Sequence, residues 1–219
     1  MNNEMNDNLD VIRINTDSWR NESLPIEQVS IELFPLVKED HPALRKVLPT
    51  FDFSNPPVDP VKFASSLVET CKKYRAYGLS ANQCGFEHRV FVMGGEDQYV
   101  AFFNPRIVSY SKDSVEMEEG CLSFMDLFLK IKRYGEVFVE YEDYTGTTKI
   151  AHYTGLTARC FQHELDHMNG IVYHSHVKPL ALQMANKKRT KLFNMRNKLQ
   201  KAMVKKVKAE FNANKFRNS

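Results

Sequence analysis

Residues 158–169 read ARCFQHELDHMN, and their spacing predicts an amphipathic helix that carries a chemical site. At 3.6 residues per turn, His163 and His167 project from one side of this helix. The apolar residues that fall on roughly the opposite side are Ala158, Phe161, Leu165 and Met168. The two histidines therefore do not face the core through the apolar stripe, and they need another explanation.

The histidines stand one helical turn apart, close enough for two imidazole nitrogens to bind one metal ion. Glu164 is rotated from them by about 100°, so its carboxylate can reach a water molecule on that ion. This HExxH arrangement is typical of metal-assisted hydrolysis, in which the glutamate is the general acid/base. The five-residue pattern is loose, however, and on its own it is equally consistent with a chance match on a solvated helix.

Two histidines leave a hydrolytic metal site one ligand short, because such sites usually have three protein ligands and keep the fourth place for water. Cys121 is one candidate, since its thiol would ionise readily beside a cation and the neighbouring Gly120 permits an unusual turn. Cys160 is the other, because it lies one turn before His163 and near the same face of the helix. Its alternative role is that of a small buried apolar residue. Spacing leaves both cysteines open.

The composition indicates one globular domain with extensions, since the 219 residues are 42% hydrophobic and 26% charged. No stretch approaches the roughly 20 apolar residues of a membrane span. The first ten residues, MNNEMNDNLD, resemble neither a secretory signal nor an Arg-rich transit peptide, so we expect a soluble, cytoplasmic protein.

The four cysteines of such a protein are expected to be reduced thiols or metal ligands and not disulfides. We expect Cys71 in the core, and Cys84 has no ligand-like partner nearby in the sequence.

The order of local patterns indicates an α+β fold, with antiparallel β-sheets around the HExxH helix. Short β-rich runs (RVFVM, YVAFF, IVSY and EVFVEYE) lie between Arg89 and Tyr153 and are separated by Gly, Pro and Asp, which favours antiparallel strands. No regular βαβ alternation suggests a parallel sheet. The expected helices cover about 61–76, then Thr157 or Ala158 to Asn169 with Gly170 in the left-handed conformation just past the end, and finally about 179–208.

Composition also divides the chain into three parts. Residues 1–30 are polar and show no sustained period, so we expect a mobile or weakly docked extension. A catalytic domain is expected over residues 31–178, and a basic helix and tail over residues 179–219. Residues 181–219 contain twelve Lys and Arg residues against one acidic residue, Glu210, although the net charge of the whole chain is only +3.

Three separated segments resemble peptide deformylases, the metalloenzymes that remove the formyl group from the N-terminal methionine of nascent chains. The segments are YGLSANQ at residues 77–83, EGCLS at residues 119–123 and QHELDH at residues 162–167. Finding EGCLS and QHExDH together in this order is highly specific. Weaker agreement extends the likeness over about residues 31–178. The resemblance implies a metal-dependent hydrolase that acts on the formyl-methionine of nascent polypeptides.

The resemblance also implies which residues carry the chemistry. The implied metal ligands are Cys121, His163 and His167. Cys121, rather than Cys160, is then the third ligand, and Glu164 is the general acid/base. The Gln83 amide and the backbone N–H of Leu122 would stabilise negative charge on the formyl oxygen. One divalent ion per chain is implied, Fe(II) in the cell, with Zn(II) or Ni(II) also able to occupy the site.

The methionine pocket is where this chain departs from the family. The positions that match the pocket are Tyr77, Gly78, Met117, Gly120, Leu156 and Cys160. Tyr77 is bulkier than the small aliphatic residue usually found beside the substrate. Ala76 and Ser80 stand where the family commonly has Gly and Ala, and Met125 replaces a Pro after the second motif.

Two other functions remain open from the sequence. A zincin-like peptidase could use the same helix, although such peptidases generally have His or Glu where this chain offers Cys121. A catalytically silent, ribosome-binding relative could use the metal only to stabilise its fold. The retention of Glu164 and Gln83, which a structural ion does not need, argues against that alternative.

The basic segment 181–219 predicts attraction to a polyanion, and for an enzyme of nascent chains we expect this to be ribosomal RNA. Aromatic residues are sparse there, so we do not expect sequence-specific recognition of nucleic acid. The alternative is a solubilising helix that packs on the sheet by one face. The apolar residues of that face form an irregular stripe of Leu182, Ala185, Leu192, Met195, Leu199, Ala202 and Met203.

Overall fold

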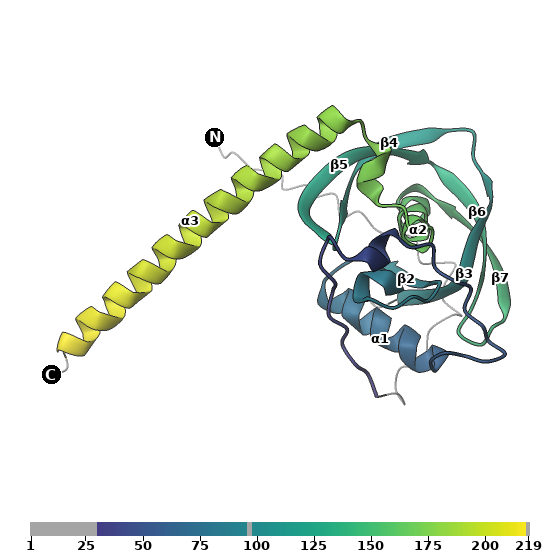
Figure 1. Cartoon of the computed structure of the whole chain (residues 1–219), viewed down its shortest axis with the longest axis horizontal. Helices are drawn as coiled ribbons and strands as arrows, with labels where there is room; N and C mark the ends of the chain where they lie inside the picture. The colour runs from purple at the N-terminus through teal and green to yellow at the C-terminus, as the bar shows by residue number, and fades with distance from the viewer. Residues whose placement is uncertain (1–29, 96–97, 218–219) are drawn as a thin grey trace, which may run out of the picture.

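The computed structural model describes residues 30–95 and 98–217, with side chains described up to residue 208, and this part is an α+β fold with antiparallel sheets (Figure 1). The expected N-terminal extension lies outside the described residues except for Ser30. The helices are α1 (Pro60–Lys73), α2 (Gly155–Met168) and α3 (Pro179–Arg217), with short 3₁₀ helices η3 (Pro42–Arg45), η4 (Ala81–Cys84) and η5 (Tyr173–His176). The strands are β1 (Gly78–Ser80), β2 (Val90–Gly95), β3 (Gln98–Tyr110), β4 (Ser114–Cys121), β5 (Phe124–Tyr134), β6 (Glu136–Glu142) and β7 (Thr148–Thr154).

The strands form two antiparallel sheets, as the sequence predicts. One sheet has five strands in the order β1-β2-β3-β6-β7, and the hairpin β4-β5 forms a second sheet. The runs YVAFF and IVSY belong to the single strand β3, which continues through Asn104 at a φ of 49° and shifts its register against β6 at that point. The runs quoted above do not include β4 and β5, although inward and outward residues alternate along β5.

Helix α1 begins after an acidic cap and ends at a left-handed residue. The Asp59 side chain accepts a hydrogen bond from the backbone N–H of Lys62 at 2.9 Å, and Pro60 follows the cap, where its missing N–H is not needed. The helix ends at Lys73, one turn short of the prediction, because Arg75 has a φ of 53° and cannot continue it.

Helix α2 is the HExxH helix, and strands surround it (Figure 1). It starts at Gly155, two residues earlier than predicted, and Gly170 follows its end with a φ of 68°, as predicted. The predicted apolar stripe of α2 is buried in a cluster with residues of β2, β3, β6 and β7, among them Phe91 and Phe102. The side that carries the histidines is buried as well, so α2 is not a solvated helix.

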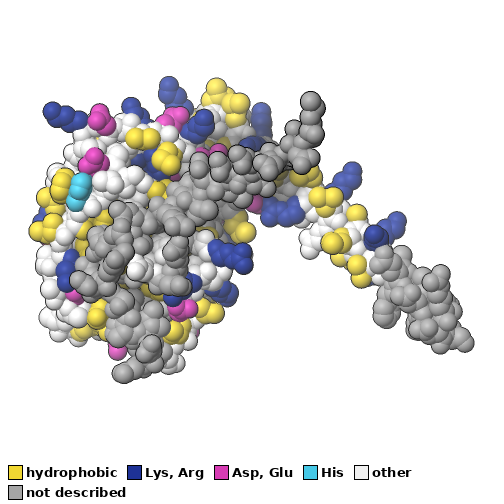
Figure 2. Space-filling model, turned by 180° about the vertical axis from the view of Figure 1, so that it is seen from behind, with side chains coloured by type: hydrophobic (Ala, Val, Ile, Leu, Met, Phe, Trp, Pro, Cys, Tyr) yellow, Lys and Arg dark blue, Asp and Glu magenta, His cyan; other side chains and the backbone are white. Residues whose placement is uncertain are grey.

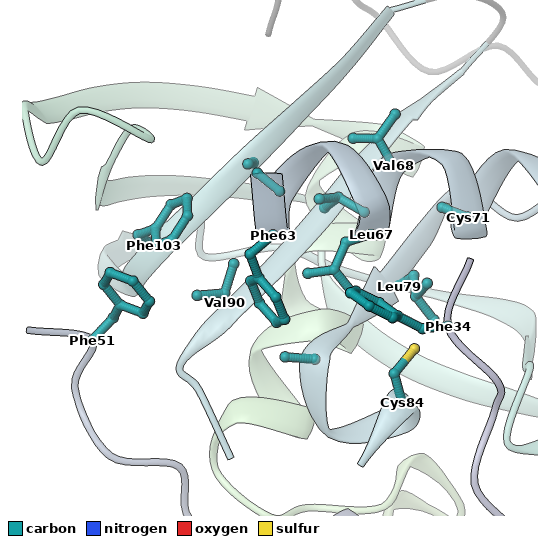
Figure 3. Close-up of a cluster of buried hydrophobic side chains, with 14 residues drawn as sticks. Phe34, Phe51, Phe63, Leu67, Val68, Cys71, Leu79, Cys84, Val90 and Phe103 are labelled. Carbon is teal, nitrogen blue, oxygen red and sulfur yellow. The ribbon is translucent and has the colours of Figure 1, made fainter. Parts of the chain in front are cut away.

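A second apolar cluster joins α1 to the edge of the five-stranded sheet (Figure 3). Phe63 and Leu67 of α1 lie against Val90 of β2 and Leu79 of β1. Cys71 is part of this cluster, as predicted. Burying one large apolar side chain of this kind stabilises the fold by about 2 kcal/mol, so the cluster fixes β1 against α1. Strand β1 also contacts α2.

Helix α3 projects away from the body of the molecule (Figure 1). It extends to Arg217, past the predicted end. Its first turns dock through Leu182 and Ala185, which pack beside the buried residues of β5 and η5, and Arg189 and Arg196 form ion pairs with the body farther along. Leu192 and the apolar residues after it are exposed, so most of the predicted stripe has no partner within the described chain. Within the described ranges, no helix combines the length and apolar character that crossing a membrane requires.

Candidate metal and substrate site

Three side chains that could bind a metal ion meet between the β4-β5 hairpin and α2. Their ligand atoms, one each from Cys121, His163 and His167, all lie within 4.8 Å of one another. Cys121 ends β4, and its Sγ is 3.4 Å from Nε2 of His167. The fold thus brings together the three residues for which the sequence predicts metal binding. A thiol with two imidazoles is a donor set that fits a soft or borderline divalent metal.

The two imidazoles favour the thiolate form of Cys121. Burial alone would raise the pKa of this thiol, but His167 and His163 lower it well below its usual range. Burial would likewise lower the pKa of His163, whereas its contacts with Cys121 and Glu119 raise it to about 10. The site therefore concentrates negative charge on a sulfur atom, the form in which cysteine binds metals.

Glu119 holds the His163 ring through the ring nitrogen Nδ1. The sequence did not assign a role to Glu119. Its Oε2 lies 3.1 Å from Nδ1 of His163, which leaves Nε2 of the ring free to bind. The same carboxylate accepts hydrogen bonds from Nε of Arg133 at 2.7 Å and from Nη1 of Arg159 at 2.5 Å. Burial opposes its ionisation, but His163 and Arg133 hold the pKa of Glu119 at about 2. Such a contact fixes the orientation and tautomer of a ligand ring.

Glu164 follows His163 on α2 and is only 4% exposed. Burial raises the pKa of its carboxyl group, and the two neighbouring imidazoles act against that rise. Its Oε2 accepts a hydrogen bond of 2.7 Å from the Ser80 hydroxyl. A buried carboxylate with a raised pKa in the wall of a pocket is a candidate for proton transfer.

Gln83 lies in η4 with its amide held at both ends. Its Oε1 accepts a hydrogen bond from the Ser80 backbone N–H at 2.9 Å. Its Nε2 lies 3.1 Å from Oγ of Ser123 and 3.4 Å from Sγ of Cys121. The donor end of the amide therefore points toward the Cys121 thiol. Ser123 lies inside the EGCLS motif, but its partner became visible only in the fold.

A cavity of about 580 Å³ opens in front of these residues. All six residues predicted to surround the substrate line it, together with Gln83, Leu122 and Glu164. Tyr77, Met125 and Phe128 also line the cavity and stay well exposed, which places them toward its mouth. The sequence did not assign Phe128 to the site.

Gly120 differs in one respect from the expectation. Its backbone is not in the left-handed region, and it lies in β4 at a shift of register between Glu119 and Cys121. A Cβ at this position would lie 2.8 Å from the Phe128 ring. Gly120 is therefore needed at a bulge for its small size, and not for an unusual turn.

Cys160 lines the same cavity as Cys121 but differs from it in charge state. Burial raises the pKa of its thiol well above the usual range. Among the described residues, its sulfur does not belong to the group of donor atoms that could share an ion. Its position fits a neutral residue in the wall of the cavity.

Comparison with known proteins gives one consistent family. The family model of polypeptide deformylase matches residues 33–183. A peptide deformylase of Rhizobium meliloti (strain 1021) is 33% identical over 162 residues, which cover 72% of this chain and 92% of that protein. The crystal structure of peptide deformylase from Thermotoga maritima is 32% identical with a TM-score of 0.62, and covers 68% of this chain and 99% of that one. The structure from Legionella pneumophila is 30% identical with a TM-score of 0.66, and covers 76% and 98%.

Proposed function

Because this chain belongs to the polypeptide deformylase family, which removes N-terminal formyl groups from nascent polypeptides, we propose that Cys121, His163 and His167 hold its metal ion. The observation that carries this proposal is the meeting of three donor atoms within 4.8 Å, next to Glu164 in the wall of the cavity. Buried polar groups need partners, and a divalent cation satisfies a thiolate and two imidazole nitrogens together.

In this proposal, different residues around the ion carry out proton transfer and charge stabilisation during amide hydrolysis. When bound, the ion supplies a Lewis acid that acidifies water and polarises the formyl carbonyl. Glu164 accepts the proton of the attacking water and delivers it to the departing amine, so that formate leaves and a free N-terminus remains. The Gln83 amide and the Leu122 backbone N–H donate hydrogen bonds to the formyl oxygen as it becomes negative. One such donor can stabilise the transition state by about 3 kcal/mol.

The metal is Fe(II) in this proposal, with Zn(II) and Ni(II) as alternatives that the same ligands accept. Thiolate and imidazole ligands suit all three ions and disfavour hard cations such as Mg²⁺. Metal analysis of protein purified without oxygen distinguishes them, because Fe(II) would otherwise be lost to oxidation before measurement.

The cavity is proposed to receive the formyl-methionine end of the substrate. Met117, Leu156 and Cys160 offer it an apolar surface, and Gly78 and Gly120 leave room for the peptide backbone. Tyr77 is 46% exposed, so its ring can lie along the following residues of the peptide and need not close the pocket. We expect the bulky Tyr77 to be compatible with methionine for this reason.

One assay separates this function from its rivals. The full chain, loaded with nickel or anaerobically with ferrous ion, is given formyl-Met-Ala-Ser, and formate release is measured, with acetyl-Met-Ala-Ser as the matched control. Formate release without cleavage of the acetyl peptide is expected. Cleavage of internal peptide bonds alone would support a zincin-like peptidase, and no reaction with metal bound would support a catalytically silent relative.

The substrate class leads to a proposed location and partner. Nascent chains carry the formyl group where translation takes place, so we propose that the protein works in the cytoplasm. We also propose that the basic region 181–219 approaches ribosomal RNA and makes no sequence-specific contacts with nucleic acid. Figure 2 shows Lys, Arg and hydrophobic side chains together on the described part of α3.

The division of the chain into an extension (1–30), a catalytic domain (31–178) and a basic helix with its tail (179–219) stays a prediction.

A further inference from the structure

We propose that Ser80 is a positioning residue that holds the Glu164 carboxylate in the orientation needed for proton transfer. This inference rests on the proposed role of Glu164 as general acid/base. Ser80 stands at one of the departures from the related family, which commonly has alanine there. The hydroxyl group therefore needs an explanation within this chain.

The two carboxylate oxygens of Glu164 have different surroundings. Oε2 accepts the hydrogen bond of 2.7 Å from the Ser80 hydroxyl. Oε1 lies beside Gly78, so close that a Cβ there would be 2.5 Å from it. Residues 78–80 form β1, which packs in the apolar cluster with α1 and also contacts α2. Strand β1 thus holds one oxygen by a hydrogen bond and leaves space for the other.

Ser80 stands behind the carboxylate as seen from the cavity. Gly78 and Glu164 line the cavity, whereas Ser80 is fully buried and is not among the described residues that line it. The serine therefore cannot touch a substrate, and its effect has to pass through Glu164. Oε1, on the side of Gly78, is the oxygen left for the proton.

The hydrogen bond restricts a side chain that otherwise has freedom to rotate. Glutamate has three rotatable bonds, and a buried carboxylate without a partner would turn toward the nearest cation. The imidazoles of His163 and His167 are close enough to Glu164 to affect its carboxyl group. The Ser80 hydroxyl instead gives Oε2 a neutral hydrogen-bond donor. We expect the carboxylate to stay clear of the metal-binding position and to remain available to water.

Ser80 contacts the Gln83 side chain through its backbone and the Glu164 carboxylate through its side chain, so a substitution can change the second contact without the first. Its N–H holds the Gln83 amide at 2.9 Å, and this contact survives any substitution except proline. Replacing Ser80 by alanine removes the hydroxyl's contact with Glu164 and its part in the capping box of η4, but keeps the backbone contact that orients the Gln83 amide. The hydroxyl also lies 3.3 Å from the backbone carbonyl oxygen of Glu164, a longer contact that does not involve the carboxylate.

The experiment compares Ser80→Ala and Ser80→Thr in the full, nickel-loaded chain. The control is Ser65→Ala, because Ser65 is also fully buried and its hydroxyl has no hydrogen-bond partner among the described residues. We expect Ser80→Ala to lower kcat on formyl-Met-Ala-Ser by about 10-fold, the size expected for one hydrogen bond to a charged group, with KM and bound nickel unchanged. Ser80→Thr keeps a hydroxyl and should retain at least half of the wild-type kcat, and Ser65→Ala should match the wild type.

A second readout does not depend on activity. The carboxylate stretching band of Glu164 is assigned in the infrared spectrum of the nickel-loaded chain, with ¹³C-labelled glutamate and the Glu164→Gln variant as reference. Ser80→Ala should shift this band, and Ser80→Thr should leave it near the wild-type position. An unshifted band in Ser80→Ala, an unchanged kcat, or equal loss in the Ala and Thr variants would each overturn the proposal. Failure of the wild type to release formate would instead count against the proposed function, and the band would still test the contact.

Discussion

Cys121 and Cys160 lie in the wall of one cavity and are nevertheless in different states. His167 and His163 lower the pKa of the Cys121 thiol, because both rings can carry positive charge beside it. Desolvation raises the pKa of the half-buried Cys160 thiol, and Glu164 is the largest electrostatic contribution in the same direction. Of these two cysteines, Cys121 is therefore the one whose surroundings favour the thiolate, the form that binds metals.

This difference predicts opposite outcomes for two alanine substitutions. Cys121→Ala should empty the site or weaken metal binding greatly, because it removes one of three ligands, whereas Cys160→Ala should keep its metal. Bound metal per chain, measured by elemental analysis after dialysis, decides between them. Retained metal in Cys121→Ala together with loss in Cys160→Ala would exchange the two assignments.

Glu164 provides a second test at the scale of one residue. Glu164→Ala should keep the metal and lose turnover by about 100-fold or more, because this residue transfers protons and does not bind the ion. Metal content and formate release are measured on the same sample. Loss of metal in proportion to activity would make Glu164 a ligand and contradict the mechanism.

The sequence could suggest roles for His163, Glu164 and His167 because these depend on residue type and short spacing, whereas only the resemblance to a family favoured Cys121 over Cys160. His163, Glu164 and His167 are one turn of one helix, and that local geometry follows from the helix alone. Ser80 and Ser123 could not be recognised in the same way. Their hydroxyls reach Glu164 and Gln83 only after segments far apart in the chain have been packed together, and no spacing rule encodes that contact.

At the scale of elements, the β4-β5 hairpin is attached to α2 through buried charges. Glu119 of β4 binds Arg133 of β5 and Arg159 of α2, and Arg133 also donates to Asp166 of α2 at 2.8 Å. These side chains are almost fully buried, apart from a small exposed part of Asp166. Removing one member of such a network leaves other charges in the interior without a partner.

Glu119→Ala should therefore lower the free energy of unfolding by about 3 kcal/mol. It should also weaken metal binding by about 10-fold or more, since it releases His163. Chemical denaturation and metal titration measure the two effects. The matched control is Glu140→Ala, which removes the more exposed ion pair with Arg106 and should cost about 0.5 kcal/mol. Equal losses in both variants would show that the buried network does not hold the hairpin.

The same network predicts how the protein responds to acid. The pKa of Glu119 is about 2 in the fold, below its ordinary value of 4.5. A carboxyl group whose pKa is lowered by folding stabilises the protein above the unfolded pKa, and that contribution is lost as the pH falls toward the folded one. The difference in stability between wild type and Glu119→Ala should thus shrink below about pH 4, when unfolding is followed over a pH series.

Element boundaries show where local patterns stop being sufficient. The α2 helix begins at Gly155, ahead of the predicted start, because β7 runs directly into it and Thr154 serves as its N-cap. Strand β3 passes through Asn104, whose side chain bonds both the N–H and the carbonyl oxygen of Phe51. That contact joins residues far apart in the chain, so the sequence alone suggested two strands there.

At the scale of the whole molecule, the contacts of α3 with the body lie in the first half of the helix. Leu182 and Ala185 pack against the body, and Arg189 and Arg196 form ion pairs with Glu39 and Asp126. Farther along, Met203 is 71% exposed. Helical periodicity in the sequence could predict the helix but not how much of its apolar face is covered, because that depends on where the surface of the body ends.

Because these contacts of α3 with the body come before residue 204, the residues after them can be deleted to test the ribosome proposal. Deleting residues 204–219 removes five of the twelve basic residues of the tail but keeps the contacts of Leu182, Ala185, Arg189 and Arg196 with the body. Hydrolysis of formyl-Met-Ala-Ser should therefore stay within about two-fold of the wild type, because the cavity is formed entirely by earlier residues. A control chain keeps its full length but carries Gln at Lys201, Lys205, Lys206 and Lys208, which removes charge and leaves the apolar residues of the helix.

Association with ribosomes is then measured by co-sedimentation over a salt series. The intact chain should bind at low salt and lose affinity steeply as salt rises, because each Lys or Arg that neutralises a phosphate releases a counterion. Both the truncated chain and the Gln-substituted chain should bind more weakly and depend less on salt. If the Gln-substituted chain bound like the wild type while the truncated chain did not, the exposed apolar residues would be the contact. Equal, salt-insensitive binding by all three forms would leave α3 as a solvated helix with no part in recognition.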